Sequence, residues 1–261
     1  MIKYYSPGFI FINCFLILFS LILTNKLTPL AKKLGHNLKI LDIPNERKIH
    51  KNPIARSGGI AIYTGFIISL VLGFIFINSS NIQVNLNDIS LLFTIIPTTF
   101  LFFSIGLVDD FLNVSAVLRL ALQIMISIWV WDQGIKIDNL NFLFNKIIDI
   151  NLPQFLSLFL TIIWITGITN AINWLDGMNG LLGLFTLITS LGFFTISFLT
   201  FKPILLIISS LLIGVSISFL YNNMFKLKIF MGDSGSLFFG SLLSLMGICL
   251  ASDFNFSSNS Y

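Results

Sequence analysis

Long apolar segments recur along the chain between short polar stretches, and this pattern limits the possible folds more than any other feature. A helix of about 20 mostly apolar residues is long enough to cross the hydrocarbon core of a bilayer. Eight such segments are predicted, at 8–24, 59–77, 89–108, 117–131, 154–171, 180–200, 203–220 and 236–252. The pattern therefore predicts an all-α integral membrane protein, a multi-span helical bundle with about eight transmembrane helices.

The composition agrees with a membrane protein. Charged residues make up 10% of the 261 residues and apolar residues 56%, whereas a soluble domain carries about 25% charged residues. Little sequence lies between the apolar segments, so we expect a single polytopic membrane domain over residues 1–261. No small-x-small cleavage site follows Leu23, so the first segment is expected to remain as a helix rather than be cleaved. Cys14 and Cys249 lie within apolar segments, which favours packing roles over a disulfide or a zinc site.

The distribution of basic residues predicts the orientation in the membrane. The segment 25–57 contains Lys26, Lys32, Lys33, Lys39, Arg47, Lys48, Lys51 and Arg56. Cytoplasmic loops are enriched in Lys and Arg, so this segment is predicted to be cytoplasmic and the N-terminus to lie outside. Alternation then makes the segments 109–116, 172–179 and 221–235 cytoplasmic as well. Every dense polar motif falls on this side: NERKIHKNPIARSGG (45–59), GLVDDFLN (106–113), NAINWLDGMNG (170–180) and KIFMGDSGS (228–236).

Two adjacent carboxylates, Asp109 and Asp110, close the third apolar segment. Ionisable residues at the edge of a membrane segment often mark a reaction centre, although a helix end that simply meets water is the alternative. Like charges side by side repel, so we expect a divalent cation or a basic neighbour to relieve the pair. One of the two carboxylates could then act as a general base.

The motif NAINWLDGMNG places polar residues three positions apart: Asn170, Asn173, Asp176 and Asn179. Residues at i and i+3 share a helix face, so the first of these residues are predicted to form one polar stripe at the inner end of the fifth segment. Asn side chains suit a base or a sugar, and Asn and Asp oxygens can ligate a hard cation. The alternative is hydrogen bonding between helices of the bundle.

The motif GDSGS and the basic loop complete the polar face. Asp233 could hold a magnesium ion that bridges to phosphate oxygens, and Ser234 or Ser236 is expected to cap the following helix. A plain loop-to-helix cap without a ligand is the alternative, and the chain lacks the Walker pattern GxxxxGK[ST]. Arg47, Lys48, His50, Lys51 and Arg56 could clamp phosphates. They could equally be the topological anchor that rests on anionic lipid.

Together these motifs favour phosphoryl transfer between a soluble anionic donor and a lipid acceptor, because that chemistry needs positioning and charge neutralisation. The segments DIPNERKIHKNPIARSGG, GLVDDFLN, NAINWLDGMNGL and KIFMGDSGSLFFG, in this order, resemble the polyprenyl-phosphate N-acetylhexosamine-1-phosphate transferases. The form of the first loop resembles the branch that initiates surface polysaccharides such as O-antigen in lipopolysaccharide. It is less similar to the peptidoglycan phospho-MurNAc-pentapeptide transferase branch, which stays an alternative.

The resemblance implies a specific reaction and site. An N-acetylhexosamine 1-phosphate would move from a UDP-amino-sugar, with UDP-GlcNAc or a related UDP-N-acetylated sugar expected, to undecaprenyl phosphate with release of UMP. The cofactor would be Mg²⁺, with Mn²⁺ as a substitute, and the active site would face the cytoplasm from a bacterial inner membrane. Asp109 and Asp110 would be the catalytic carboxylates, Asn173 and Asp176 would lie at the nucleotide and metal region, Asn179 would read uridine, and Asp233 would ligate magnesium. A homodimer is a candidate assembly, and no nucleic acid is expected as a partner.

The sequence departs from the family pattern at three points. Asn179 stands where many bacterial members carry Asp, and Lys226 and Leu227 replace the usual Pro-Ala. The family usually has ten or eleven spans and a cytoplasmic histidine-rich loop, so the eight predicted spans imply a C-terminally short member. A catalytically impaired fragment or a scaffold that binds lipid phosphate is therefore kept as an alternative. A transporter is disfavoured because the polar motifs cluster at one interface rather than at mid-membrane.

Overall fold

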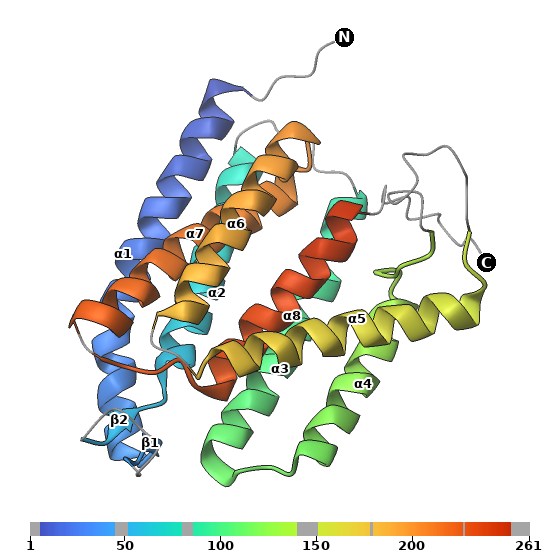
Figure 1. Cartoon of the computed structure of the whole chain (residues 1–261). Coiled ribbons are helices and arrows are strands. Elements are labelled where there is room, and N and C mark those ends of the chain that lie inside the picture. Colours follow the sequence, from blue (N-terminus) through green and yellow to red (C-terminus); the bar gives the residue numbers. More distant parts are fainter. Residues whose placement is uncertain are drawn as a thin grey trace.

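A computed structural model describes residues 6–44, 52–79, 86–139, 151–177, 180–226 and 228–251. The elements are helices α1 (Pro7–Asn37), α2 (Gly58–Ser79), α3 (Leu86–Leu112), α4 (Ala116–Asp132), α5 (Gln154–Leu175), α6 (Leu181–Leu199), α7 (Pro203–Tyr221) and α8 (Gly232–Ala251), strands β1 (Leu41–Asp42) and β2 (Ile54–Ala55), and a short π-helix η1 (Asn222–Lys226). Figure 1 shows a bundle of long helices with the small β-hairpin at one end.

The predicted all-α, multi-span class is confirmed. Among the described residues, 7 helices are long and apolar enough to cross a membrane. The eighth, α4, has 17 residues and falls just below the length needed for that count. The largest difference from the sequence-based prediction is α1, which continues to Asn37 instead of ending at residue 24. The extension contains several Leu and Lys residues, which favour helix even where the segment is too polar to be recognised as a span.

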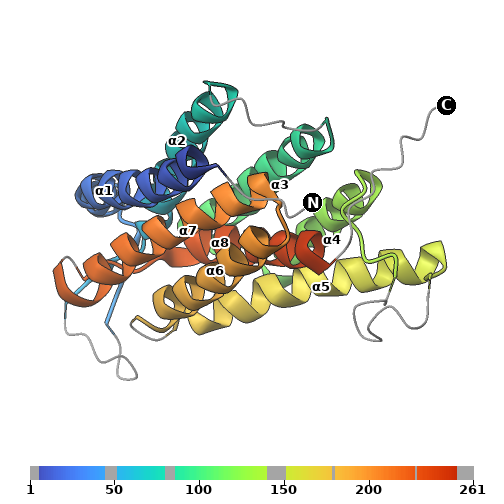
Figure 2. The ribbon, with the colours of Figure 1, turned by 90° about the horizontal axis from the view of Figure 1, so that it is seen from above.

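Helices α7 and α8 form the centre of the bundle. Almost all of their side chains are buried, and the other helices surround them (Figures 1 and 2). Helix α8 contacts α2, α3, α5 and α6, whereas α7 contacts α1, α2 and α6. Large apolar side chains such as Phe93 and Phe155 remain exposed on the surrounding helices. Such exposure fits a bundle whose outer surface is solvated by lipid.

Strands β1 and β2 form a short antiparallel pair within the basic segment 25–57, which was predicted only as a loop. Leu41 pairs with Ala55 in an antiparallel register. The backbone then continues the pairing with the segment ahead of α8, because Phe230 donates a hydrogen bond to the Ala55 carbonyl and Gly58 donates one to the Phe230 carbonyl. The entrances of α2 and α8 are therefore held side by side, at the end of the bundle that carries the polar motifs.

Candidate active site

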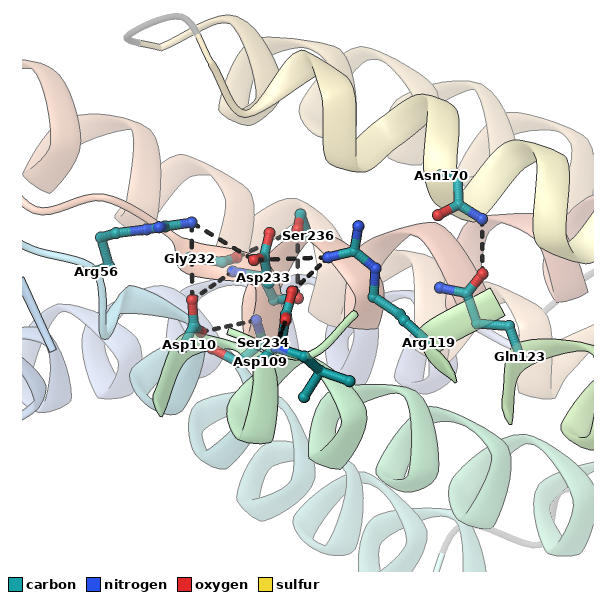
Figure 3. Close-up of polar contacts among 11 residues, drawn as sticks. Arg56, Asp109, Asp110, Arg119, Gln123, Asn170, Gly232, Asp233, Ser234 and Ser236 are labelled. Atoms are coloured by element: carbon teal, nitrogen blue, oxygen red, sulfur yellow. Dashed lines mark hydrogen bonds and ion pairs between the residues drawn. The ribbon is translucent and has the colours of Figure 1, made fainter. Parts of the chain in front are cut away.

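The polar motifs meet where α3 ends and α4 and α8 begin. Figure 3 shows Asp109 and Asp110 from α3, Arg119 from α4, Asp233 from α8, and Arg56 from the segment between β2 and α2. These residues are far apart in the sequence, and dashed lines mark the hydrogen bonds and ion pairs that join them. A divalent cation or a basic neighbour was expected beside the Asp109–Asp110 pair, and the structure shows basic neighbours: Arg119 pairs with Asp109, and Arg56 lies 3.9 Å from Asp110.

Asp110 caps the first turn of α8. Its Oδ1 accepts a hydrogen bond from the backbone N–H of Asp233 at 2.9 Å, and its Oδ2 accepts one from Ser234 at 3.0 Å. The Asp110 side chain is only 1% exposed. The sequence-based prediction that Ser234 or Ser236 caps this helix is wrong. The helix begins at Gly232, so both serines lie inside it, and Asp110 provides the cap. The Ser236 hydroxyl instead donates to the Gly232 carbonyl at 3.2 Å.

Asp109 and Arg119 form a partly buried ion pair across the α3–α4 turn. Arg119 Nη1 contacts Asp109 Oδ2, and Asp109 Oδ1 accepts a hydrogen bond from the Val114 backbone N–H at 2.7 Å. Asp109 is 6% exposed. Within the part of the chain that the structure describes, Nη1 is the only Arg119 nitrogen with a polar contact, so its other N–H groups can still bind an anion.

Asp233 is the most accessible carboxylate of the three from α3 and α8. Its Oδ2 lies 3.5 Å from Arg56 Nη2 and 3.9 Å from Arg119 Nη1, and its side chain is 18% exposed. Asp233 therefore sits between two guanidinium groups without a short hydrogen bond to either. A carboxylate placed in this way keeps lone pairs available for a metal ion or for water.

Asp176 ends α5 and faces the same cluster. Burial raises the pKa of its carboxyl well above the usual range, Arg56 opposes this shift, and the negative charges of Asp233 and Asp110 add to it. The backbone N–H of Gly232 lowers the pKa of the Asp176 carboxyl and so opposes part of this shift. Gly232 has φ of 76°, a left-handed conformation that glycine adopts without strain.

The charge of the cluster matches a divalent cation. Four carboxylates (Asp109, Asp110, Asp176 and Asp233) face two guanidinium groups (Arg56 and Arg119) among the described residues, which leaves about two negative charges when all six are ionised. The same part of the chain contains no ready-made group of three His, Cys, Asp or Glu side chains for a metal. Magnesium commonly uses only one or two carboxylates and takes its other ligands from water and phosphate oxygens, so this donor set fits it.

Asn170 and Asn173 lie on the last two turns of α5. Asn170 Nδ2 donates to Gln123 Oε1 of α4 at 2.6 Å and to the Thr166 carbonyl at 2.8 Å, beside the cluster and not within it (Figure 3). This geometry favours the alternative of a hydrogen bond between helices. Asn173 is partly exposed, and its side chain has no hydrogen-bond partner among the described residues. Its substrate-binding and metal-binding roles stay predictions.

Comparison with known proteins gives the family. The model of glycosyl transferase family 4 matches residues 92–251, which is more than half of the chain. The chain belongs to glycosyl transferase family 4. The region that matches this family includes Asp109, Asp110, Arg119, Asp176 and Asp233, while Arg56 lies ahead of it.

Curated relatives cover most of this chain. A protein of Bacillus subtilis (strain 168), named a probable undecaprenyl-phosphate N-acetylglucosaminyl 1-phosphate transferase, is 30% identical over 85% of this chain and 59% of its own length. A decaprenyl-phosphate N-acetylglucosaminephosphotransferase of Mycobacterium leprae is 31% identical over 85% of this chain and 57% of its own length. The chain thus spans less than two thirds of the length of these family 4 relatives.

Some predicted site residues lie outside the described ranges: Arg47, Lys48, His50 and Asn179. Their predicted roles in binding substrate stay predictions. The sequence reasoning missed Arg119 as a site residue, although a signal was present, because Arg119 is the only charged residue in the apolar segment 117–131. A charge inside such a segment is costly unless it has a partner or a function. Arg56 was one of five basic residues proposed as phosphate clamps, and the structure places it beside Asp110 and Asp233.

Proposed function

We propose that this family 4 chain transfers N-acetylglucosamine 1-phosphate from UDP-GlcNAc to undecaprenyl phosphate and releases UMP. The transfer takes place at the cytoplasmic face of a bacterial inner membrane and is the first membrane step of a cell-envelope polysaccharide. The observation that carries this proposal is the cluster of carboxylates and guanidinium groups at one end of a membrane bundle. The relatives are named as transferases of undecaprenyl phosphate and decaprenyl phosphate, and these names support the same substrate class.

The reaction exchanges one phosphorus–oxygen bond for another. An oxygen of the lipid phosphate forms a bond to the phosphorus that carries the sugar, and the bond from that phosphorus to the bridging oxygen breaks. UMP leaves with the bridging oxygen and its electron pair. A phosphate monoester has a second pKa near 6, so at neutral pH the acceptor is largely dianionic and needs charge neutralisation more than a strong base.

Arg119 and Arg56 are the groups that would neutralise this charge. Arg119 has N–H groups free to bind phosphate oxygens, and its ion pair with Asp109 fixes the guanidinium beside Asp233. Asp109 acts on the acceptor side by holding Arg119, because both of its carboxylate oxygens already accept hydrogen bonds. Arg56 neutralises the opposite side of Asp233 and stays 34% exposed, within reach of a soluble donor.

Asp233, Asp176 and Asn173 are the residues that would hold Mg²⁺, or Mn²⁺ in its place. The bound ion would neutralise the pyrophosphate and stabilise the leaving UMP. Oxygen donors of this type suit a hard cation, and Asp233 and Asp176 lie within one electrostatic cluster. Asn179 is assigned to the uridine, and Arg47, Lys48 and His50 to the donor pyrophosphate.

The proposal is tested with the full chain purified in detergent, UDP-GlcNAc, undecaprenyl phosphate and MgCl₂. We expect a lipid-linked N-acetylglucosamine that is absent when EDTA replaces the metal and absent from an Asp233→Ala variant. Binding of undecaprenyl phosphate without any product, under conditions that activate the B. subtilis relative, would instead support the scaffold alternative.

A further inference from the structure

The last turn of α3 and the first turn of α8 are in direct backbone contact. A Cβ atom at Gly106 would lie 2.2 Å from the Asp233 carbonyl oxygen and 2.5 Å from the Ser234 nitrogen, so only glycine permits this approach. Asp110 follows Gly106 by four residues and therefore lies on the same face of α3. From there its two carboxylate oxygens accept hydrogen bonds from the backbone N–H groups of Asp233 and Ser234, in the first turn of α8. One face of α3 thus determines where α8 begins.

We propose that Asp110 is a positioning residue that fixes Asp233 for metal binding, rather than a group that reacts with substrate. This inference rests on the proposed transferase function and refines one of its residues. The free N–H groups at the start of a helix carry a partial positive charge, and a carboxylate there stabilises the first turn. Because Asp233 is the second residue of α8, holding this turn also holds the Asp233 side chain between Arg56 and Arg119.

The burial of Asp110 argues against a direct chemical role. Its side chain is 1% exposed, whereas that of Asp233 is 18% exposed. A general base must reach the proton that it removes, within hydrogen-bond distance or through one water. Each carboxylate oxygen of Asp110 already accepts a hydrogen bond, one from the backbone N–H of Asp233 and one from that of Ser234.

The test compares metal binding in three variants of the full chain. Asp110→Asn keeps the size of the side chain and one oxygen that accepts a hydrogen bond. Its amide N–H groups replace the other oxygen, and they cannot pair with the backbone N–H groups of α8. Gly106→Ala adds only a methyl group and no polar atom, yet it pushes α3 away from the Asp233 carbonyl. Gly167→Ala is the matched control, because a Cβ at Gly167 meets nothing within 4 Å. Mn²⁺ is the probe, and the free ion is measured by electron paramagnetic resonance in detergent without substrate.

We expect Asp110→Asn to weaken Mn²⁺ binding by about 10–100-fold, the usual effect of removing a group that orients a metal ligand. Gly106→Ala should weaken it in the same direction, and Gly167→Ala should bind as the wild type does. At saturating metal, Asp110→Asn should recover a kcat within about tenfold of the wild type, because the variant still contains every reacting group. Should Gly106→Ala fail to fold, the Asp110→Asn titration and its kcat at saturating metal decide the question.

Three results would overturn the inference. Wild-type Mn²⁺ affinity in Asp110→Asn together with a kcat lowered by about 10²–10⁴-fold would show that Asp110 acts on the substrate. Weak binding in Asp110→Asn with normal binding in a folded Gly106→Ala would make Asp110 itself a metal ligand. A wild-type chain without Mn²⁺ affinity would remove the metal site altogether. A wild type that binds Mn²⁺ but transfers no sugar phosphate would contradict the transferase proposal alone, since the binding comparison still decides the role of Asp110.

Discussion

Arg119 on α4 is ion-paired with Asp109 at the end of α3, and the same Arg119 nitrogen lies 3.9 Å from Asp233 Oδ2. This single guanidinium therefore connects the predicted acceptor carboxylate with the predicted metal ligand. Its side chain is 22% exposed, which leaves it accessible to a phosphate that arrives at the membrane surface. The pair gives the buried Asp109 a counter-charge beside a second carboxylate.

The first prediction follows from this pair. Arg119→Gln should lower kcat/KM for transfer by about 100-fold or more, because it removes the phosphate-binding charge and leaves Asp109 buried without a counter-charge. Arg119→Lys keeps the charge but not the forked geometry, so its activity should fall between those of Arg119→Gln and the wild type. Steady-state rates at saturating Mg²⁺ measure both. Full activity in Arg119→Gln would remove Arg119 from the site.

The sequence predicted the spans well because each hydrophobic run is long enough to be recognised by itself. It also placed Asp109 and Asp110 at the end of a helix, since they follow such a run directly. It could not show that Asp110 caps α8, because that contact joins residues separated by more than a hundred positions. The pairing depends on which helices are neighbours in the bundle, and hydropathy alone does not give helix order.

The hydrogen-bond partner of Asn170 could not be predicted for a similar reason. The i, i+3 spacing correctly placed it on the face that also carries Asn173, but the neighbour of that face could not be read from spacing. In the fold, α4 packs beside this part of α5, and Gln123 becomes the partner of Asn170. Arg119, four residues before Gln123, points to the cluster instead (Figure 3).

The second prediction separates Asn170 from Asn173. Asn170→Ala should lower the stability of the protein in detergent by about 1–3 kcal/mol, because it leaves the buried Gln123 without a partner. Its KM for UDP-GlcNAc should stay within about threefold of the wild type. Asn173→Ala should show the reverse pattern, with near-normal thermal stability and a KM raised by about tenfold or more. A raised KM in Asn170→Ala at unchanged stability would return Asn170 to the substrate site.

The third prediction concerns pH. Because burial raises the pKa of Asp176, this carboxyl keeps its proton to a higher pH than an exposed Asp does, and a metal ion must displace that proton. Metal affinity should therefore increase as pH rises toward the raised pKa, by up to about tenfold per pH unit for one exchanged proton, and level off above it. The Mg²⁺ concentration for half-maximal rate, measured from pH 6 to pH 8.5, tests this expectation. Asp176→Asn should flatten the dependence, and an unchanged slope in that variant would assign the proton to another group.

The fourth prediction tests the side of the membrane on which the cluster lies. In a Cys14→Ser background, Gln133→Cys at the end of α4 should react with an impermeant thiol reagent in intact cells. Ala116→Cys at the start of α4 should react only after permeabilisation. Both positions are exposed, and the buried Cys249 serves as the internal blank. The expectation comes from the excess of Lys and Arg in segment 25–57, and labelling of Ala116→Cys from outside would invert the orientation.

The central claim is that a sugar phosphate, and not the sugar alone, moves to the lipid. The most direct measurement uses UDP-GlcNAc with radioactive phosphorus at the phosphate next to the sugar and tritium in the sugar, incubated with the purified chain, undecaprenyl phosphate and Mg²⁺. If the sugar phosphate moves, both labels should enter the lipid fraction in equal molar amounts, and unlabelled UMP should be released. Transfer of tritium alone, with the radioactive phosphorus left in UDP, would show ordinary glycosyl transfer and contradict the account.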